Sequence, residues 1–315
     1  MGDAPRYIPP DSLVEVTTRT VHGRFLLRPS RELNDIATGV VARAARRYGI
    51  GVVHFVVLSS HMHLLLVVPD AEWLAAFMRF VNGNLAKEAG RLYGWHERFW
   101  SRRYRPIVVS DEAEAQVRRL RYLLEQGCKE GLVRSPRQWP GATGIEALLS
   151  GRPLDGWWFD RTKELYARRR GESFGRYEHA DREELQLTTL PCWSELPATD
   201  VRERCAAMVR AIEHETRERL EREGRSPLGV KRILAQHPHA TPMRLSRSPA
   251  PRFHTASGTV RRRLEIAFRQ FCDWYREASA ALRAGQANVP FPPGSFPPRM
   301  PFARGAPLAL VPEPA

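Results

Sequence analysis

The first part of the chain alternates between two hydrophobic periodicities, and the order of these stretches constrains its fold most strongly. Runs of β-branched and other apolar residues predict four strands. Apolar residues at helical spacing predict three helices. Ser30 and Gly49 stand where an N-cap and a terminating glycine are expected for the first helix. The predicted strands are residues 13–22, 52–58, 61–68 and 104–109, and the predicted helices are 31–48, 71–93 and 111–126.

Strand, helix, strand, strand, helix, strand is the order of the ferredoxin-like, split βαβ arrangement. We therefore expect an α+β domain over residues 1–150, with one antiparallel sheet and two helices on one of its faces. The third helix is then free to cover the other face. Residues 151–288 predict a mostly helical extension, with amphipathic helices around residues 201–212 and 260–275. Residues 289–315 hold nine of the 25 prolines and predict an extended, disordered tail.

The charge of the chain indicates its class of partner. The sequence has 49 Lys and Arg against 35 Asp and Glu, a formal net charge of +14, which is typical of proteins that bind nucleic acid. No apolar run approaches the ~20 residues of a membrane span. The four cysteines lie far apart, which argues against a zinc ribbon and a disulfide framework. Free thiols indicate a cytoplasmic protein.

His61 and His63 are the strongest candidates for chemistry. In a strand, residues i and i+2 point to the same face, so the two imidazoles lie side by side and form a natural pair of metal ligands. The alternative interpretation is a pair of hydrogen-bonded histidines in a core strand. The His-x-His pattern by itself favours that alternative.

Tyr122 and Gln126 are the second candidate pair. They lie four residues apart, on one face of the predicted helix, and Tyr122 is nearly opposite the apolar residues Leu120 and Leu124. A tyrosine among cations can act as a nucleophile toward a phosphodiester, with the cations stabilising the charge on phosphorus. The alternative is a surface tyrosine on a basic helix. The nearby cations are Arg118, Arg119 and Lys129.

Taken together, these segments resemble the single-tyrosine HUH transposases, and most closely the REP-associated tyrosine transposases. The resemblance covers about residues 10–150. It is carried by FVVLSSHMHLLL at 55–66, FWSRRYRPIVV at 99–109, RYLLEQGCKEGLV at 121–133 and RFLLRPSRELN at 24–34.

The resemblance implies that His61 and His63 are metal ligands, that Tyr122 is the nucleophile and that Gln126 completes the metal site. It also implies Mg²⁺ or Mn²⁺ as the metal, although two imidazoles and an amide oxygen would bind zinc well. The sequence departs from the family pattern at Ser60, where asparagine is common. It also departs from Gln126 onward, where the family has Asn-Pro-Val-Arg-Ala, which leaves the DNA specificity open.

The resemblance therefore implies a transposase that cleaves single-stranded or hairpin DNA through a 5′-phosphotyrosine, acting as a homodimer or a monomer. It also implies a protein associated with the nucleoid of a bacterial cell. The alternatives are a non-catalytic nucleic-acid-binding protein on the same fold and a metal-dependent nuclease that uses water. The extension should widen the DNA footprint, so removing residues 150–315 should weaken binding while sparing residual cleavage. The predicted DNA-binding residues are Arg102, Arg103, Arg105, Arg118, Arg119 and Lys129.

Overall fold

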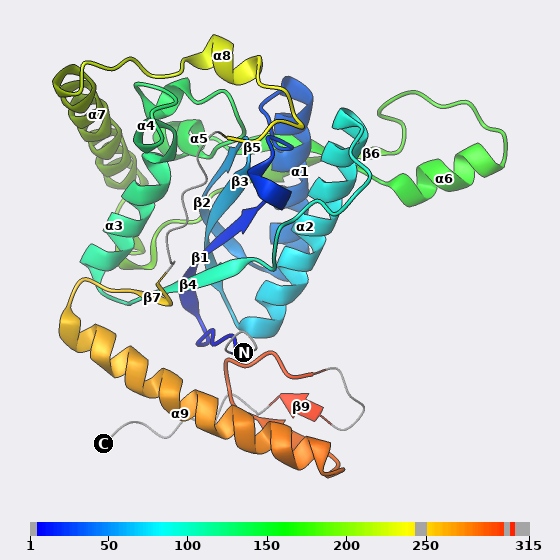
Figure 1. The fold of residues 1–315 in the computed structure, drawn as a ribbon, viewed down its shortest axis with the longest axis vertical. Coiled ribbons are helices and arrows are strands. Elements are labelled where there is room, and N and C mark those ends of the chain that lie inside the picture. The colour runs from blue at the N-terminus through cyan, green and yellow to red at the C-terminus, as the bar shows by residue number, and fades with distance from the viewer. Residues whose placement is uncertain (1–4, 243–250, 299–302, 306–315) are drawn as a thin grey trace.

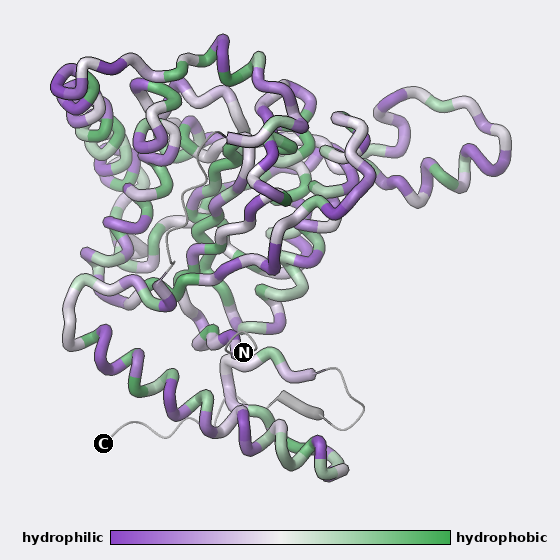
Figure 2. Tube along the Cα trace, viewed as in Figure 1, coloured by the Kyte–Doolittle hydropathy of each residue, from purple (hydrophilic) through white to green (hydrophobic). Residues whose placement is uncertain are grey.

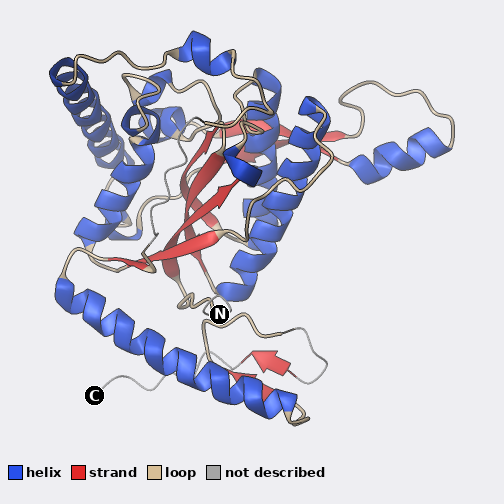
Figure 3. Cartoon of the chain, in the orientation of Figure 1, coloured by secondary structure: helices blue, strands red, loops and turns tan. Residues whose placement is uncertain are grey.

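A five-stranded sheet forms the centre of the molecule in the computed structural model, which describes residues 5–242, 251–298 and 303–305 (Figure 1, Figure 3). Its strand order is β2-β3-β1-β4-β7. The first four strands pair antiparallel, and β7 is parallel to β4. This confirms an α+β fold with a mainly antiparallel sheet. The strands are β1 Ser12–Arg19, β2 Gly51–Leu58, β3 His61–Val68, β4 Arg105–Val109 and β7 Phe253–His254.

The two helices expected on one face are α1 Arg31–Tyr48 and α2 Ala71–Tyr93, and both have the predicted bounds. The Ser30 hydroxyl accepts a hydrogen bond from the Leu33 amide, and the Asp70 carboxylate accepts one from the Trp73 amide. Both helices end at a glycine in the left-handed conformation, where a side chain would be strained. Strong caps explain why the sequence located these helices so well.

Helix α3, Ala113–Leu124, covers the opposite face of the sheet (Figure 1). Two of its predicted bounds were wrong. Its N-cap is Glu112 rather than Asp111, and it breaks at Glu125, so that Gln126 opens a separate short helix, α4 Gln126–Lys129. Strand β1 also ends at Arg19, three residues early, because His22 and Gly23 have positive φ angles of 51° and 68° that a strand cannot accommodate.

Strand β3 divides the hydrophobic core between the two faces. Met62, Leu64 and Leu66 pack in a cluster with α1 and α2, which we call the α1/α2 core. Leu65 packs with Leu120, Leu123 and other residues of α3 in a second cluster, the α3 core. The side chains of β3 thus alternate as the period of a strand requires. His61 and His63 consequently belong to the face that α3 covers.

A second, two-stranded sheet packs on α1 through a close backbone approach. A methyl group at Gly39 of α1 would lie 2.4 Å from the carbonyl carbon of Trp157, and one at Gly156 would lie 2.2 Å from the Asp35 carbonyl oxygen. Both positions therefore exclude a side chain. The elements of this region are β5 Leu154–Phe159, β6 Ala180–Leu185 and the helices α5 Ile145–Ser150 and α6 Arg161–Arg169.

The two long helices predicted in the extension are α7 Ala198–Arg222 and α9 Gly258–Arg283, with α8 Val230–Leu234 between them. Helix α7 packs on α4 and α5, and α9 packs on β7 and β8. The two long helices therefore contact other elements of the molecule and not each other (Figure 1). Figure 2 shows hydrophilic and hydrophobic residues alternating along α9. Among the described residues, no helix is long and apolar enough to cross a membrane.

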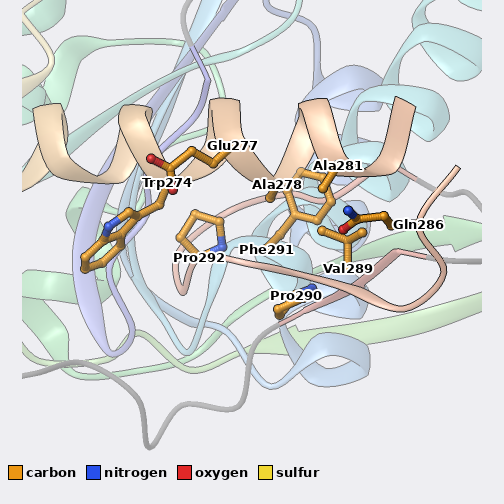
Figure 4. Close-up of a pocket in the computed structure, with 9 residues that line it drawn as sticks. All are labelled: Trp274, Glu277, Ala278, Ala281, Gln286, Val289, Pro290, Phe291 and Pro292. Carbon is orange, nitrogen blue, oxygen red and sulfur yellow. The ribbon is translucent and has the colours of Figure 1, made fainter. Parts of the chain in front are cut away.

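The prediction of a disordered tail from residue 289 was wrong for its first part. Val289–Phe291 forms β8, which pairs with β9 Ala303–Gly305. Phe291 is buried against Tyr275 of α9, and burial of this aromatic ring provides the stabilisation that composition alone did not reveal. An apolar pocket lies between α9 and β8 (Figure 4). Residues 299–302 and 306–315 lie outside the described part of the chain.

Candidate active site

The two histidines of β3 point to the same face of the sheet, toward the helix that carries Tyr122. The centres of the His61 and His63 rings are 5.1 Å apart, and the Tyr122 ring lies 6.0 Å from that of His63. Strand β3 lies between β2 and β1, so the pair is on an interior strand. Three side chains that the sequence singled out separately are therefore brought together by the packing of α3 on β3.

The two ring nitrogens of His63 differ in their hydrogen bonding. Only 5% of the residue is exposed. Its Nδ1 lies 2.7 Å from Oε1 of Glu15 and 3.1 Å from the Thr17 hydroxyl. Its Nε2 is buried and has no hydrogen-bond partner among the described residues. A buried imidazole nitrogen without a partner is where a metal ion would fit, because such an atom is otherwise satisfied by a hydrogen bond.

His61 is in a chemical state suited to the same role. Burial, together with the charge of Arg19, holds the pKa of His61 well below its usual value. The ring is therefore neutral at pH 7, which metal ligation requires. Its Nδ1 lies 3.0 Å from the Ser60 hydroxyl. Ser60, where the sequence departs from the pattern that it otherwise resembles, thus contacts the first histidine of the pair.

Tyr122 lies at the margin of the α3 core, half-buried, with cations over its ring. The guanidinium carbon of Arg119 is 4.7 Å from the ring centre and Nζ of Lys129 is 4.3 Å from it. These contacts agree with the prediction of a tyrosine set among cations. Positive charge at this ring would attract a phosphodiester and stabilise the charge that develops on it.

Gln126 is buried, with 2% of its surface exposed. Its Nε2 donates a hydrogen bond of 2.8 Å to the main-chain oxygen of Tyr122. The amide oxygen is the atom that remains for a metal. Two imidazoles and an amide oxygen fit a divalent ion. Among the described residues, no group of three His, Cys, Asp or Glu side chains could hold a metal, so a site on the histidine pair would need another kind of ligand, such as glutamine.

Glu15 is a residue of the site that sequence analysis missed. It is fully buried at the middle of β1 and forms an ion pair through Oε2 with Arg119. Burial alone would raise the pKa of Glu15, but the hydrogen bond from His63 and the charge of Arg119 oppose burial, and the pKa is lowered. The available signal was an acidic residue inside the apolar run LVEV, on the same face as Leu13 and Thr17.

The six predicted DNA-binding residues occupy different environments. Arg119 is buried and belongs to the interior of the site rather than to an outer surface. Arg118 pairs with Glu114. Arg105 is exposed and lies opposite Thr17, which in turn lies opposite His63, so one cross-strand row joins Arg105 to the histidine pair. Arg102 and Arg103 are exposed in the segment that precedes β4.

Trp100 and Tyr104, which lie between these arginines, pack against the α1/α2 core. The Trp100 indole N–H donates to the Asn82 carbonyl, and the Arg6 guanidinium stacks over the Tyr104 ring at 3.9 Å. Both aromatic side chains thus have protein partners. The pocket of Figure 4 contains none of the predicted site residues.

Comparison with known proteins gives a distant match. No known family profile matches the chain, and no curated protein matches it. The chain is similar to a solved REP-associated tyrosine transposase bound to a REP hairpin, with 16% identity, a TM-score of 0.38 and coverage of 48% of this chain and 86% of that one. It is also similar to a protein of Deinococcus radiodurans R1 described as a candidate transposase, with 19% identity, a TM-score of 0.28 and coverage of 38% and 95%. Both similarities cover less than half of this chain.

Proposed function

We propose that this protein is a transposase that cleaves single-stranded or hairpin DNA through a covalent phosphotyrosine at Tyr122. The observation that carries the proposal is the meeting of the three rings, with 5.1 Å between His61 and His63 and 6.0 Å between His63 and Tyr122. A candidate nucleophile and a candidate ligand pair come from elements far apart in the sequence. A protein that only binds DNA has no need of this arrangement.

The fold supports the same proposal. The antiparallel order β4-β1-β3-β2, with α1 and α2 on one face, favours a ferredoxin-like, split βαβ domain. In such a domain the second face of the sheet is free to carry a site. Here that face carries the histidine pair, Glu15 and helix α3.

His61, His63 and Gln126 are the residues that would hold Mg²⁺ or Mn²⁺, which when bound would polarise the scissile phosphate. Tyr122 supplies the attacking oxygen. A bond forms between this oxygen and phosphorus while the bond from phosphorus to the 3′ oxygen breaks. The Tyr122 phenol gives up its proton and the released 3′ oxygen takes one up, so the products are a 5′-phosphotyrosine and a 3′-OH. Because the phosphotyrosine ester conserves the free energy of the broken phosphodiester bond, rejoining the DNA requires no ATP.

The test is denaturing electrophoresis of labelled single-stranded and hairpin DNA after incubation with the protein and Mn²⁺. We expect a covalent protein–DNA adduct that chelation with EDTA prevents. Tyr122→Phe removes only the hydroxyl, so cleavage and adduct should both disappear while DNA binding remains. His61→Ala should also lose cleavage, with partial recovery at higher Mn²⁺ concentration.

The alternatives give different results in the same assay. A non-catalytic DNA-binding protein shifts the DNA and forms neither adduct nor cut product. A nuclease that uses water cuts DNA without an adduct, and its Tyr122→Phe variant cuts at the wild-type rate. Either result would contradict the tyrosine mechanism.

A further inference from the structure

Glu15 is a carboxylate in an unfavourable place. It lies at the middle of β1, with strands on both sides and with none of its surface exposed. A buried charge is strongly disfavoured unless it is paired and hydrogen-bonded. The carboxylate of Glu15 meets both requirements between its two oxygens, because Oε1 accepts hydrogen bonds from His63 and Thr17 while Oε2 forms the ion pair with Arg119. Each of these partners leads to the candidate site.

The first contact determines the state of His63. A carboxylate only accepts hydrogen bonds, so Nδ1 of His63 must carry the proton at the 2.7 Å contact. In a neutral ring, Nε2 then carries the lone pair. This Nε2 is the buried atom without a hydrogen-bond partner among the described residues. Glu15 therefore keeps the lone pair of His63 on the side of the ring away from β1, where a metal ion can take it.

The second contact positions the helix of the nucleophile. Arg119 is 6% exposed and extends from α3 to the sheet, where it pairs with Glu15. The same guanidinium lies over the Tyr122 ring, 4.7 Å from its centre. One carboxylate on β1 thus joins a ligand on β3 to the tyrosine on α3.

We propose that Glu15 is a positioning residue that fixes the lone pair of His63 for metal binding and holds Arg119 against Tyr122. The role of Glu15 toward Tyr122 rests on the proposed function. Its role toward His63 requires only that His63 binds a metal ion. A purely structural ion pair would stabilise the fold equally well but would leave metal affinity unchanged.

Glu15→Gln tests this distinction, because glutamine keeps the shape and one acceptor but removes the charge. The matched control is Glu183→Gln on β6. Glu183 is also buried, at 4% exposure, and pairs with Arg43 and Arg46, but it lies outside the site. Mn²⁺ binding to the full chain is measured by calorimetry, beside the melting temperature and the DNA adduct.

We expect both variants to melt below the wild type. Only Glu15→Gln should bind Mn²⁺ about 10- to 100-fold more weakly, the usual effect of losing the hydrogen-bond partner of a metal-ligating histidine. Its adduct should recover at raised Mn²⁺. Wild-type Mn²⁺ affinity in Glu15→Gln, with a lower melting temperature like that of Glu183→Gln, would reduce Glu15 to a structural role.

A measurement on the wild type does not depend on whether the variant folds. In ¹⁵N-histidine-labelled protein without metal, the His63 ring should show a protonated Nδ1 and an unprotonated Nε2. The opposite tautomer would overturn the inference, as would a wild-type chain that binds no Mn²⁺. If Glu15→Gln weakens Mn²⁺ binding but the wild type forms no DNA adduct, the proposed function fails and the role of Glu15 toward His63 stands.

Discussion

Buried polar residues identify the site at the scale of single side chains. The layer between the sheet and α3 is largely apolar, yet Glu15, His63 and Arg119 are buried in it, and Gln126 is buried where α4 begins; each of the four is less than 9% exposed. Polar groups in such a layer destabilise the fold unless they find partners. The first three do so by pairing with one another, and Gln126 bonds to the backbone of Tyr122. This concentration separates the site from ordinary core packing.

His54 provides a prediction on pH. It is fully buried and neither ring nitrogen has a hydrogen-bond partner among the described residues. Burial lowers its pKa to about 3, whereas an unfolded histidine titrates near pH 6.5. Between about pH 3 and pH 6.5, His54 is therefore protonated in the unfolded chain and neutral in the folded chain. The contribution of neutral His54 to stability is complete above pH 6.5 and is lost as the pH falls toward 3.

We expect His54 to lower the free energy of unfolding by about 1.4 kcal/mol for each pH unit below 6.5. Urea unfolding of wild type and His54→Phe at several pH values between 6.5 and 4.5 measures it. The variant should show a shallower decline of the unfolding free energy than the wild type, and His96→Gln, at an exposed histidine, should not. Parallel pH profiles for wild type and His54→Phe would show that the buried ring does not contribute.

Close packing between elements depends on two glycines, one on α1 and one on β5. At Gly39 a methyl group would overlap the backbone of Trp157, which cannot move aside as a flexible side chain can. We expect Gly39→Ala to destabilise the fold by about 1–3 kcal/mol, as overpacking does. The result is read from the free energy of unfolding in urea.

Gly83 is the control for this prediction. It lies on α2, is exposed, and an added methyl group would meet nothing within 4 Å. Alanine is favoured over glycine in a helix by about 0.5–1 kcal/mol, so Gly83→Ala should stabilise the protein. Equal changes at the two positions would contradict the close approach of α1 and β5.

At the scale of the whole molecule, the hydrophobic core does not separate at residue 150. The α3 core contains Trp193, Ile212 and Ile233, and the α1/α2 core contains Phe253 and Phe271. Deleting residues 150–315 would expose both clusters. The expectation that such a deletion spares residual cleavage is therefore replaced by an expectation that it unfolds the chain. The functional division of the chain at this residue remains a prediction.

Point substitutions test the DNA surface without this difficulty. Arg105 is exposed in the cross-strand row that leads to His63, whereas Arg169 is exposed on α6 (Figure 1). If Arg105 neutralises one phosphate of single-stranded DNA, Arg105→Ala should weaken binding and reduce the slope of log affinity against log salt by about 0.7. Arg169→Ala should leave the slope unchanged. Fluorescence anisotropy over a salt series distinguishes the two, and equal slopes would exclude Arg105 as a phosphate contact.

The sequence by itself determined the local elements and which side chains of each element share a face. Strand alternation placed His61 and His63 together, and capping residues set the ends of α1 and α2, because these properties depend on neighbours only a few residues away. The net charge and the resemblance to a transposase family also required no structure.

Only the tertiary structure decided which elements meet. The pairing of Glu15 with His63 and Arg119 joins three separate elements. The addition of β7 to the sheet joins residue 253 to residue 108. No periodicity encodes such contacts, since they arise from how the faces pack and from the need of each buried charge for a partner. For this reason the sequence could indicate Tyr122 and the histidines, while the carboxylate that links them became visible only in the folded chain.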